Sequence, residues 1–168
     1  MRQLRLKTGF TLLEMTVVMA IMGILATAAI GAFIASQQKG RDAQRKSDLA
    51  QVQRAMEAYT ADHGAYPAAV SGKIGACGAS FDQACSWGDE LKDSQGTVYM
   101  KRLPKDPAVN QNYVYVTSLD QRQYQLFALL ENKNDPMIAT YTQVCNTGGS
   151  TCNFGLSSSN TIPSEVLQ

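Results

Sequence analysis

The hydrophobic and polar positions divide the chain into an apolar segment near the N-terminus and a longer segment of mixed polarity. From Phe10 to Ala35 the only ionisable side chain is Glu14. A helix of about 26 residues rises about 39 Å, which exceeds the roughly 30 Å of a bilayer's hydrocarbon core. The pattern therefore predicts a membrane-spanning helix. Glu14 lies about one helical turn past Phe10, so it is expected near the membrane surface on the N-terminal side.

The residues that follow predict a continuation of this helix with one apolar face. Gln37 to Asp62 lacks proline and consists mainly of good helix formers. Its apolar residues recur at intervals of three and four positions and therefore share one face; they are Leu49, Val52, Met56 and Tyr59. Charged residues are expected on the other faces, among them Arg45, Lys46, Arg54 and Glu57. Gly64, with Pro67 shortly after it, predicts the end of one helix of about 50 residues.

Runs rich in β-branched and aromatic residues predict a small antiparallel sheet after the helix. Tyr113–Val116 and Gln123–Leu130 flank Ser118–Gln121, which is a hairpin signal. Ile138–Val144 is predicted as a third strand, and Thr97–Met100 as an edge strand or a turn. The predicted fold class is α+β, with the apolar stripe of the long helix covering one face of the sheet.

The connections are long and rich in small residues. Ala65–Gln95 is predicted as a loop in which Ser80–Leu91 forms a short helix with Ser80 as its cap. Trp87 within it is expected to fill the core rather than to bind a ligand. The tail from Ser157 to Gln168 has little to bury and is expected to be mobile.

Four cysteines fall as two close pairs, Cys77 with Cys85 and Cys145 with Cys152. Their spacings differ from the CxxC pairs of structural zinc sites, so two local disulfides are predicted. Disulfides persist in oxidising compartments, which places the C-terminal part outside the cytoplasm. Basic residues flank the apolar run on both sides, so the positive-inside rule does not decide the topology.

The start of the apolar run carries a processing motif. A short leader with three basic residues precedes Gly9, and Lys7-Thr8-Gly9-Phe10-Thr11-Leu12-Leu13-Glu14 resembles the cleavage site of type IV pilins and of the major pseudopilins of type II secretion systems. Leu103-Pro104-Lys105-Asp106-Pro107, followed by a Tyr-rich strand, also resembles the major pseudopilin pattern.

This resemblance implies a type IV pilin-like fold and a set of site residues. A prepilin peptidase would cut between Gly9 and Phe10 and methylate the new N-terminal amine of Phe10. Glu14 would then meet the N-terminal amine of a neighbouring subunit during assembly. The expected segments are the leader (1–9), the transmembrane and assembly helix (10–35), the amphipathic half of the same helix (36–64) and the globular C-terminal part (65–168).

The resemblance also implies a function, the structural subunit of a type IV pilus or a pilus-like filament. Such a subunit is a single-pass precursor in the cytoplasmic membrane and then part of an extracellular or periplasmic homopolymer. Its partners are the prepilin peptidase, the assembly platform and other pilins. One alternative is the major pseudopilin of a type II secretion system. Another, a membrane-anchored binding module that never polymerises, is disfavoured by Glu14 and by the cleavage motif.

Other classes fit less well. An ordinary secretory signal, with Ala26-Thr27-Ala28 as its cleavage site, has an apolar core of only about 7–15 residues. Loss of the leader removes Arg2, Arg5 and Lys7, which lowers the 15 basic residues to 12 against 14 acidic ones and changes the net charge from +1 to −2. A near-neutral chain provides no electrostatic signal for nucleic acid.

Neither a catalytic set nor a cofactor is expected. The one histidine, His63, lies at the predicted helix end and is expected to cap carbonyl groups. Major pseudopilins, by resemblance, bind calcium in a loop after the second strand. The weak candidate ligands here are scattered without the tight spacing of a calcium loop, whose ion takes about 6–8 oxygens. They are Asp106, Asp120, Glu131 and Asp135.

Overall fold

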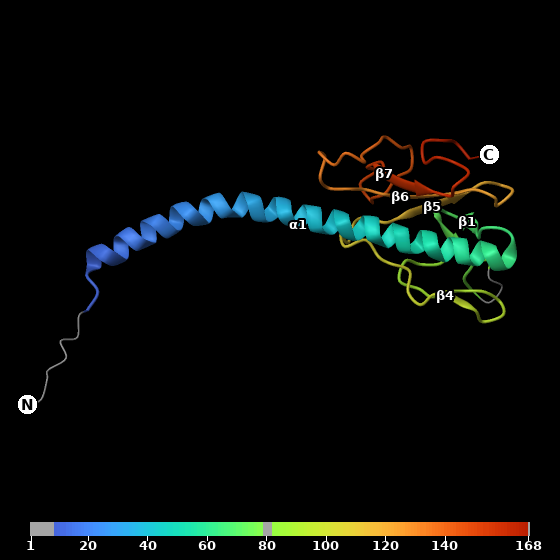
Figure 1. Ribbon diagram of the computed structural model, residues 1–168, viewed down its shortest axis with the longest axis horizontal. Coiled ribbons are helices and arrows are strands. Elements are labelled where there is room, and N and C mark those ends of the chain that lie inside the picture. The colour runs from blue at the N-terminus through green and yellow to red at the C-terminus, as the bar shows by residue number, and fades with distance from the viewer. Residues whose placement is uncertain (1–8, 79–81, 168) are drawn as a thin grey trace, which may run out of the picture. The chain divides into compact units, whose positions relative to one another are not determined.

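The computed structural model describes residues 9–78 and 82–167. The predicted leader up to Thr8 and the predicted cap Ser80 lie outside the described residues. One long helix, α1 (Leu12–His63), has 52 residues and confirms the predicted continuous helix (Figure 1). Its N-terminal half belongs to a unit that ends at Gln38, and its C-terminal half belongs to a compact unit that begins at Lys39.

The helix ends where the sequence predicts. Gly64 has a φ of 72° and donates its N–H to the carbonyl of Thr60 at 2.7 Å. Glycine adopts this left-handed conformation without steric cost, which is why it commonly terminates helices. His63 places Nδ1 3.0 Å from the carbonyl oxygen of Tyr59, so its predicted capping role is confirmed.

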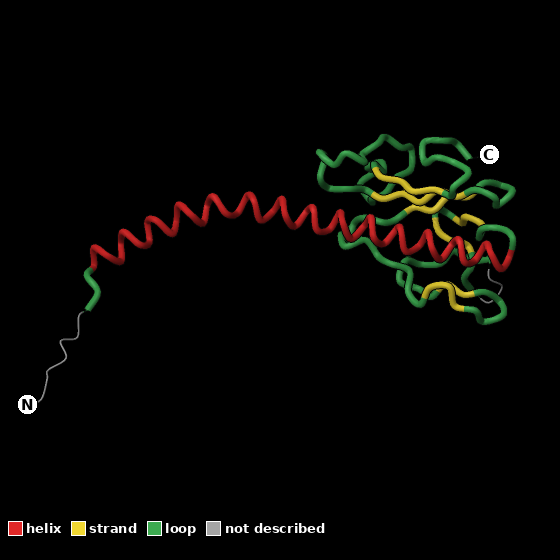
Figure 2. The backbone as a smooth tube through the Cα atoms, viewed as in Figure 1, coloured by secondary structure: helices red, strands yellow, loops and turns green. Residues whose placement is uncertain are grey.

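In residues 64–78 and 82–167, seven short strands follow the helix and form three antiparallel sheets (Figure 2). The strands are β1 (Ala68–Val70), β2 (Lys73–Gly75), β3 (Leu91–Lys92), β4 (Val98–Met100), β5 (Val114–Thr117), β6 (Tyr124–Ala128) and β7 (Phe154–Ser157). β1 pairs with β2, β3 pairs with β4, and β6 lies between β5 and β7. In the view of Figure 1, β4 and the three-stranded sheet lie on opposite sides of the C-terminal half of α1.

The predicted hairpin is present as β5 and β6. Their register pairs Val114 with Phe127 and Thr117 with Tyr124. Every residue of β6 is buried, as expected for the central strand of a covered sheet.

The predicted third strand at Ile138–Val144 is wrong. The strand that pairs with the free edge of β6 is β7, with Leu126 opposite Leu156 and Ala128 opposite Phe154. Phe154 is buried, whereas no residue from 138 to 144 is buried. A strand gains stability by burying side chains on at least one face, so β7 is the more stable partner.

The predicted mobile tail is also wrong over most of its length. Ser157 belongs to β7, and Ser158 is buried and donates its N–H to the carbonyl of Tyr124 at 3.1 Å. The Gln125 side chain donates to the carbonyl oxygens of Ile162 and Glu165, both at 2.8 Å. The tail is therefore attached to the central strand.

The short helix predicted before Leu91 is absent from the described residues 82–90. Gln83 instead forms a bridge with Cys77, and a turn follows in which Gly88 has a φ of 108°. Trp87 fills the core as predicted, because it is only 7% exposed and its Nε1–H donates to the carbonyl of Tyr113 at 2.9 Å.

The core lies between the amphipathic half of α1 and the sheets. Leu49, Val52 and Met56 are fully buried, and Tyr59 packs against the same cluster. The predicted apolar stripe is therefore confirmed. The sheet contributes Tyr115, Tyr124, Leu126 and Phe154 to this cluster.

Candidate functional site

The predicted cleavage site lies in an exposed segment before α1. Gly9 and Phe10 are exposed and belong to no helix or strand, and the helix begins two residues later at Leu12. The predicted scissile bond therefore lies in an accessible part of the chain. The Phe10 side chain is 79% exposed.

The carboxylate of Glu14 is bound by the residue that caps the helix. Oε2 of Glu14 accepts the backbone N–H of Thr11 at 2.8 Å and the Thr11 hydroxyl at 2.9 Å. The N–H of Glu14 in turn points to the Thr11 hydroxyl oxygen at 3.2 Å. These reciprocal bonds form a capping box, in which a Thr and a Glu three residues apart satisfy helix-end donors. The sequence analysis missed Thr11, although the Thr-x-x-Glu spacing is a recognised signal.

The apolar half of α1 exposes its large side chains. No residue in the most apolar stretch of α1 is buried in the described structure, and α1 is long and apolar enough to cross a membrane. The exposed residues include Leu12, Leu13, Met19, Ile24 and Phe33. This helix therefore fits a membrane anchor, whose side chains would contact lipid or other helices.

The candidate calcium ligands are held by groups of the protein itself. Oxygens of Asp106 accept from Arg45 at 2.8 and 2.9 Å, and those of Asp135 accept from Lys46 at 2.8 and 2.7 Å. Asp120 accepts from the Ser118 hydroxyl at 2.6 Å. In residues 9–78 and 82–167, no three acidic, histidine or cysteine side chains are arranged to hold a metal ion. The donor set does not fit a calcium site.

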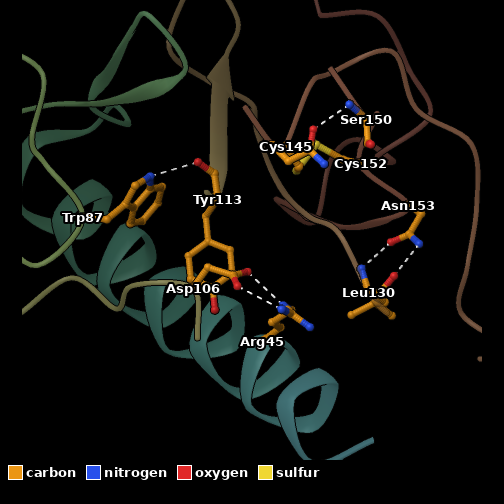
Figure 3. Close-up of a disulfide and its surroundings, with 10 residues drawn as sticks. Arg45, Trp87, Asp106, Tyr113, Leu130, Cys145, Ser150, Cys152 and Asn153 are labelled. Atoms are coloured by element: carbon orange, nitrogen blue, oxygen red, sulfur yellow. Dashed lines mark hydrogen bonds and ion pairs between the residues drawn. A yellow bond between two sulfur atoms is a disulfide. The ribbon is translucent and has the colours of Figure 1, made fainter. Parts of the chain in front are cut away.

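Arg45 is the centre of a buried ionic cluster. Its predicted place on a face other than the apolar stripe is wrong, because it stands four positions before Leu49 and is buried on the same face. Its guanidinium is fully buried and binds three carboxylates: Asp42 at 2.7 Å, Asp106 at 2.8 Å, and Glu131 at 2.8 Å. Figure 3 shows the pair of Arg45 with Asp106. Arg41 also pairs with Glu131. A buried arginine has lost its hydration, and these carboxylates compensate for that loss.

Ion pairs with basic side chains of α1 lower the pKa values of two carboxylates, Glu131 and Asp135. The hydrogen bond from Arg41, aided by Arg45, lowers the pKa of Glu131 to about 2. The hydrogen bond from Lys46 lowers the pKa of Asp135 in the same way. Both carboxylates therefore remain charged well below neutral pH.

Both expected disulfides are present in the structure. Cys77 is bonded to Cys85 and Cys145 to Cys152, and no free cysteine occurs in the part of the chain described. Cys85, Cys145 and Cys152 are buried. Each bond closes a loop of fewer than ten residues, so it restrains a local segment rather than the whole unit.

The comparisons with known proteins agree with this arrangement. Residues 4–30 match the prokaryotic N-terminal methylation motif, and residues 32–136 match type II secretion system protein G. The chain belongs to the type II secretion protein G family. The match ends before Cys145 and β7, so the last part of the chain lies beyond the family model.

Several relatives share this family. The type II secretion system core protein G of Vibrio cholerae is 30% identical over 129 residues, which are 77% of this chain and 84% of the relative. The protein of the same name from Escherichia coli K12 is 30% identical over 76% of this chain and 84% of the relative, and that from Pseudomonas aeruginosa is 30% identical over 76% and 85%. No solved structure matches significantly.

The predicted class of pilin-like filament subunit is thereby confirmed. Within that class, the family match agrees with the alternative prediction of a major pseudopilin of a type II secretion system rather than with a type IV pilus subunit. The apolar helix and the methylation motif fit a membrane-anchored precursor.

Proposed function

We propose that this protein is a major pseudopilin, the repeating structural subunit of a type II secretion pseudopilus. It is made as a single-pass precursor in the cytoplasmic membrane, with its C-terminal part outside. Prepilin peptidase cuts between Gly9 and Phe10 and methylates the amine of Phe10. Mature subunits then polymerise through α1 on the assembly platform, together with other pseudopilins, into a periplasmic filament. The protein is a structural component and not an enzyme.

One observation supports this proposal: the carboxylate of Glu14 stands at the first turn of α1, in an apolar half whose other residues from Phe10 to Ala35 are uncharged. In the isolated subunit Thr11 binds this carboxylate. In a filament of packed helices, a carboxylate without a partner would be removed from water at a cost of several kcal/mol. The amine of Phe10 on a neighbouring subunit is a suitable partner, and it exists only after cleavage. Uncut precursor therefore cannot form the pair.

The proposal is tested by replacing Glu14 with alanine and Thr16 with alanine as the matched control. Thr16 is exposed in the same turn of the helix and has no part in the proposed pair. Both variants should enter the membrane and be cleaved, because both residues are exposed and belong to the N-terminal unit rather than to the compact unit that begins at Lys39. The Glu14 variant should form few or no fibres in electron micrographs of overproducing cells, whereas the control should form normal numbers.

Intact mass tests the processing step. The mature wild-type protein should begin at Phe10 and carry one added methyl group. A start at Ala29 would support an ordinary signal peptide instead. Cells that lack the protein should fail to export type II substrates while keeping any surface pili, and loss of pili with normal export would support a pilus subunit.

A further inference from the structure

The segment between β6 and β7, Glu131–Asn153, is long and has no strand of its own. We call it the β6–β7 segment. In the resembling major pseudopilins, calcium is expected in a loop after the second strand, yet the carboxylates here do not fit such a site. We propose that basic side chains of α1 take the structural place of a metal ion, so that the fold of this pseudopilin does not require calcium.

The start of the β6–β7 segment is bound by Asp42 and Arg45 of α1. Asp42 accepts the N–H groups of Glu131 and Asn132 at 2.9 and 2.8 Å. Arg45 donates to Asp42 and to Glu131, and Arg41 pairs with Glu131 from the preceding turn. One buried guanidinium thus joins the helix to this segment, as a coordinated ion would.

The next turn of the segment is bound by Lys46. Its Nζ donates to both carboxylate oxygens of Asp135, at 2.8 and 2.7 Å. The side chains of Lys46 and Asp135 are only 27% and 14% exposed, so water competes weakly for this pair. The ammonium also lies 5.6 Å from the ring centroid of Phe154 in β7, a distance that allows a favourable cation–π contact.

The end of the β6–β7 segment is held by uncharged groups, namely an asparagine side chain and a disulfide. Asn153 accepts the N–H of Leu130 at 2.6 Å and donates to the carbonyl of Leu130 at 3.0 Å, which joins the two ends of the segment (Figure 3). The disulfide between Cys145 and Cys152 closes the loop just before Asn153. The first cysteine of this loop is held by the backbone of Asn112 in the same chain, whose N–H donates to the Cys145 carbonyl at 2.8 Å.

These contacts leave little for calcium to add. Calcium binds about 6–8 oxygens, and carboxylates supply most of its charge compensation. The carboxylates of Glu131 and Asp135 already accept from two arginines and one lysine. An ion that bound here would have to displace those donors and leave the buried guanidinium of Arg45 with one carboxylate fewer, which is unfavourable.

The first test compares thermal unfolding of the full-length protein in detergent with excess calcium chloride or excess EGTA. A calcium site saturated a hundredfold above its Kd would raise Tm by roughly 5–10 °C. We expect a difference below about 1 °C. A rise of several degrees in calcium would overturn the proposal.

The second test replaces Lys46 with methionine, which keeps the aliphatic stem and the helix propensity but removes the charge. The matched control is Lys133→Met, since Lys133 is exposed in the same segment. Hydrogen–deuterium exchange of peptides from residues 131–153 should become roughly five- to tenfold faster in the Lys46 variant, equally in calcium and EGTA. Exchange equal to that of the control would refute the role of Lys46. Both tests measure the isolated subunit, so their outcome is independent of filament assembly.

Discussion

Replacing Arg45 with alanine should strongly destabilise the globular part of this pseudopilin. The wild-type side chain is fully buried and makes four charged hydrogen bonds with Asp42, Asp106 and Glu131. Alanine removes the cation that joins the three carboxylates, and Glu131 keeps Arg41 as a basic partner. Asp42 and Asp106 would keep the backbone N–H groups that they accept from Glu131 and Ala108, so part of their desolvation remains compensated.

The size of the effect follows from this geometry. Removal of one partner from a buried ion pair costs about 3–5 kcal/mol, against a total stability of about 5–15 kcal/mol for a typical domain. Arg45→Ala should therefore lose about 3–5 kcal/mol at neutral pH. Arg45→Lys should lose less, because it keeps the charge, but it cannot reproduce the planar fork that binds two carboxylates at once.

Urea unfolding of the full-length protein in detergent is the suitable assay, since urea leaves the ionic strength unchanged whereas guanidinium chloride would screen the cluster. Arg54→Ala is the matched control, because Arg54 is exposed on the same helix. It should change stability by less than about 0.5 kcal/mol. A loss for Arg45→Ala within about 1 kcal/mol of this control would refute the argument that the cluster stabilises the fold.

Three further predictions test other parts of the structure. The pKa of Glu131 is lowered from 4.5 to about 2 in the folded protein, so its contribution to stability is present above pH 4.5 and is lost as the pH falls towards 2. The substitution Glu131→Gln should therefore flatten this part of the curve of unfolding free energy against pH, measured with urea. Trp87→Phe removes the donor to the buried carbonyl of Tyr113 and should cost about 1–3 kcal/mol in the same assay, whereas a change below about 0.5 kcal/mol would contradict the role of this bond. Peptide mapping without reduction should recover both close cysteine pairs as disulfides, and a peptide joining Cys77 to Cys152 would contradict that pairing.

Much of the fold could be predicted from the sequence because it depends on interactions within a few residues. The apolar run and the helix-forming residues after it predict one helix, and Gly64 marks its end because only the local backbone conformation is involved. The β5–β6 hairpin follows from two β-rich runs on either side of a turn. The candidate site is equally local, since Gly9, Phe10 and Glu14 form one short motif. The capping role of Thr11 was readable from its spacing to Glu14 and was missed.

The parts that only the tertiary structure decided depend on residues far apart in the chain. Arg45 stands four positions before Leu49, so the periodicity places it on the same face as the apolar stripe, but its charge argues against burial there. It becomes buried because Asp106 and Glu131, 61 and 86 positions later, are brought to it by the folded chain. β7 replaces the predicted strand at Ile138–Val144 for a similar reason. The free edge of β6 pairs with β7 because this pairing buries Phe154, and the β-propensity of each segment alone does not predict which one pairs. Local preferences thus determine the helix, its end and the hairpin, whereas the partners of a buried charge and of a sheet edge are determined by which remote segments the fold brings together.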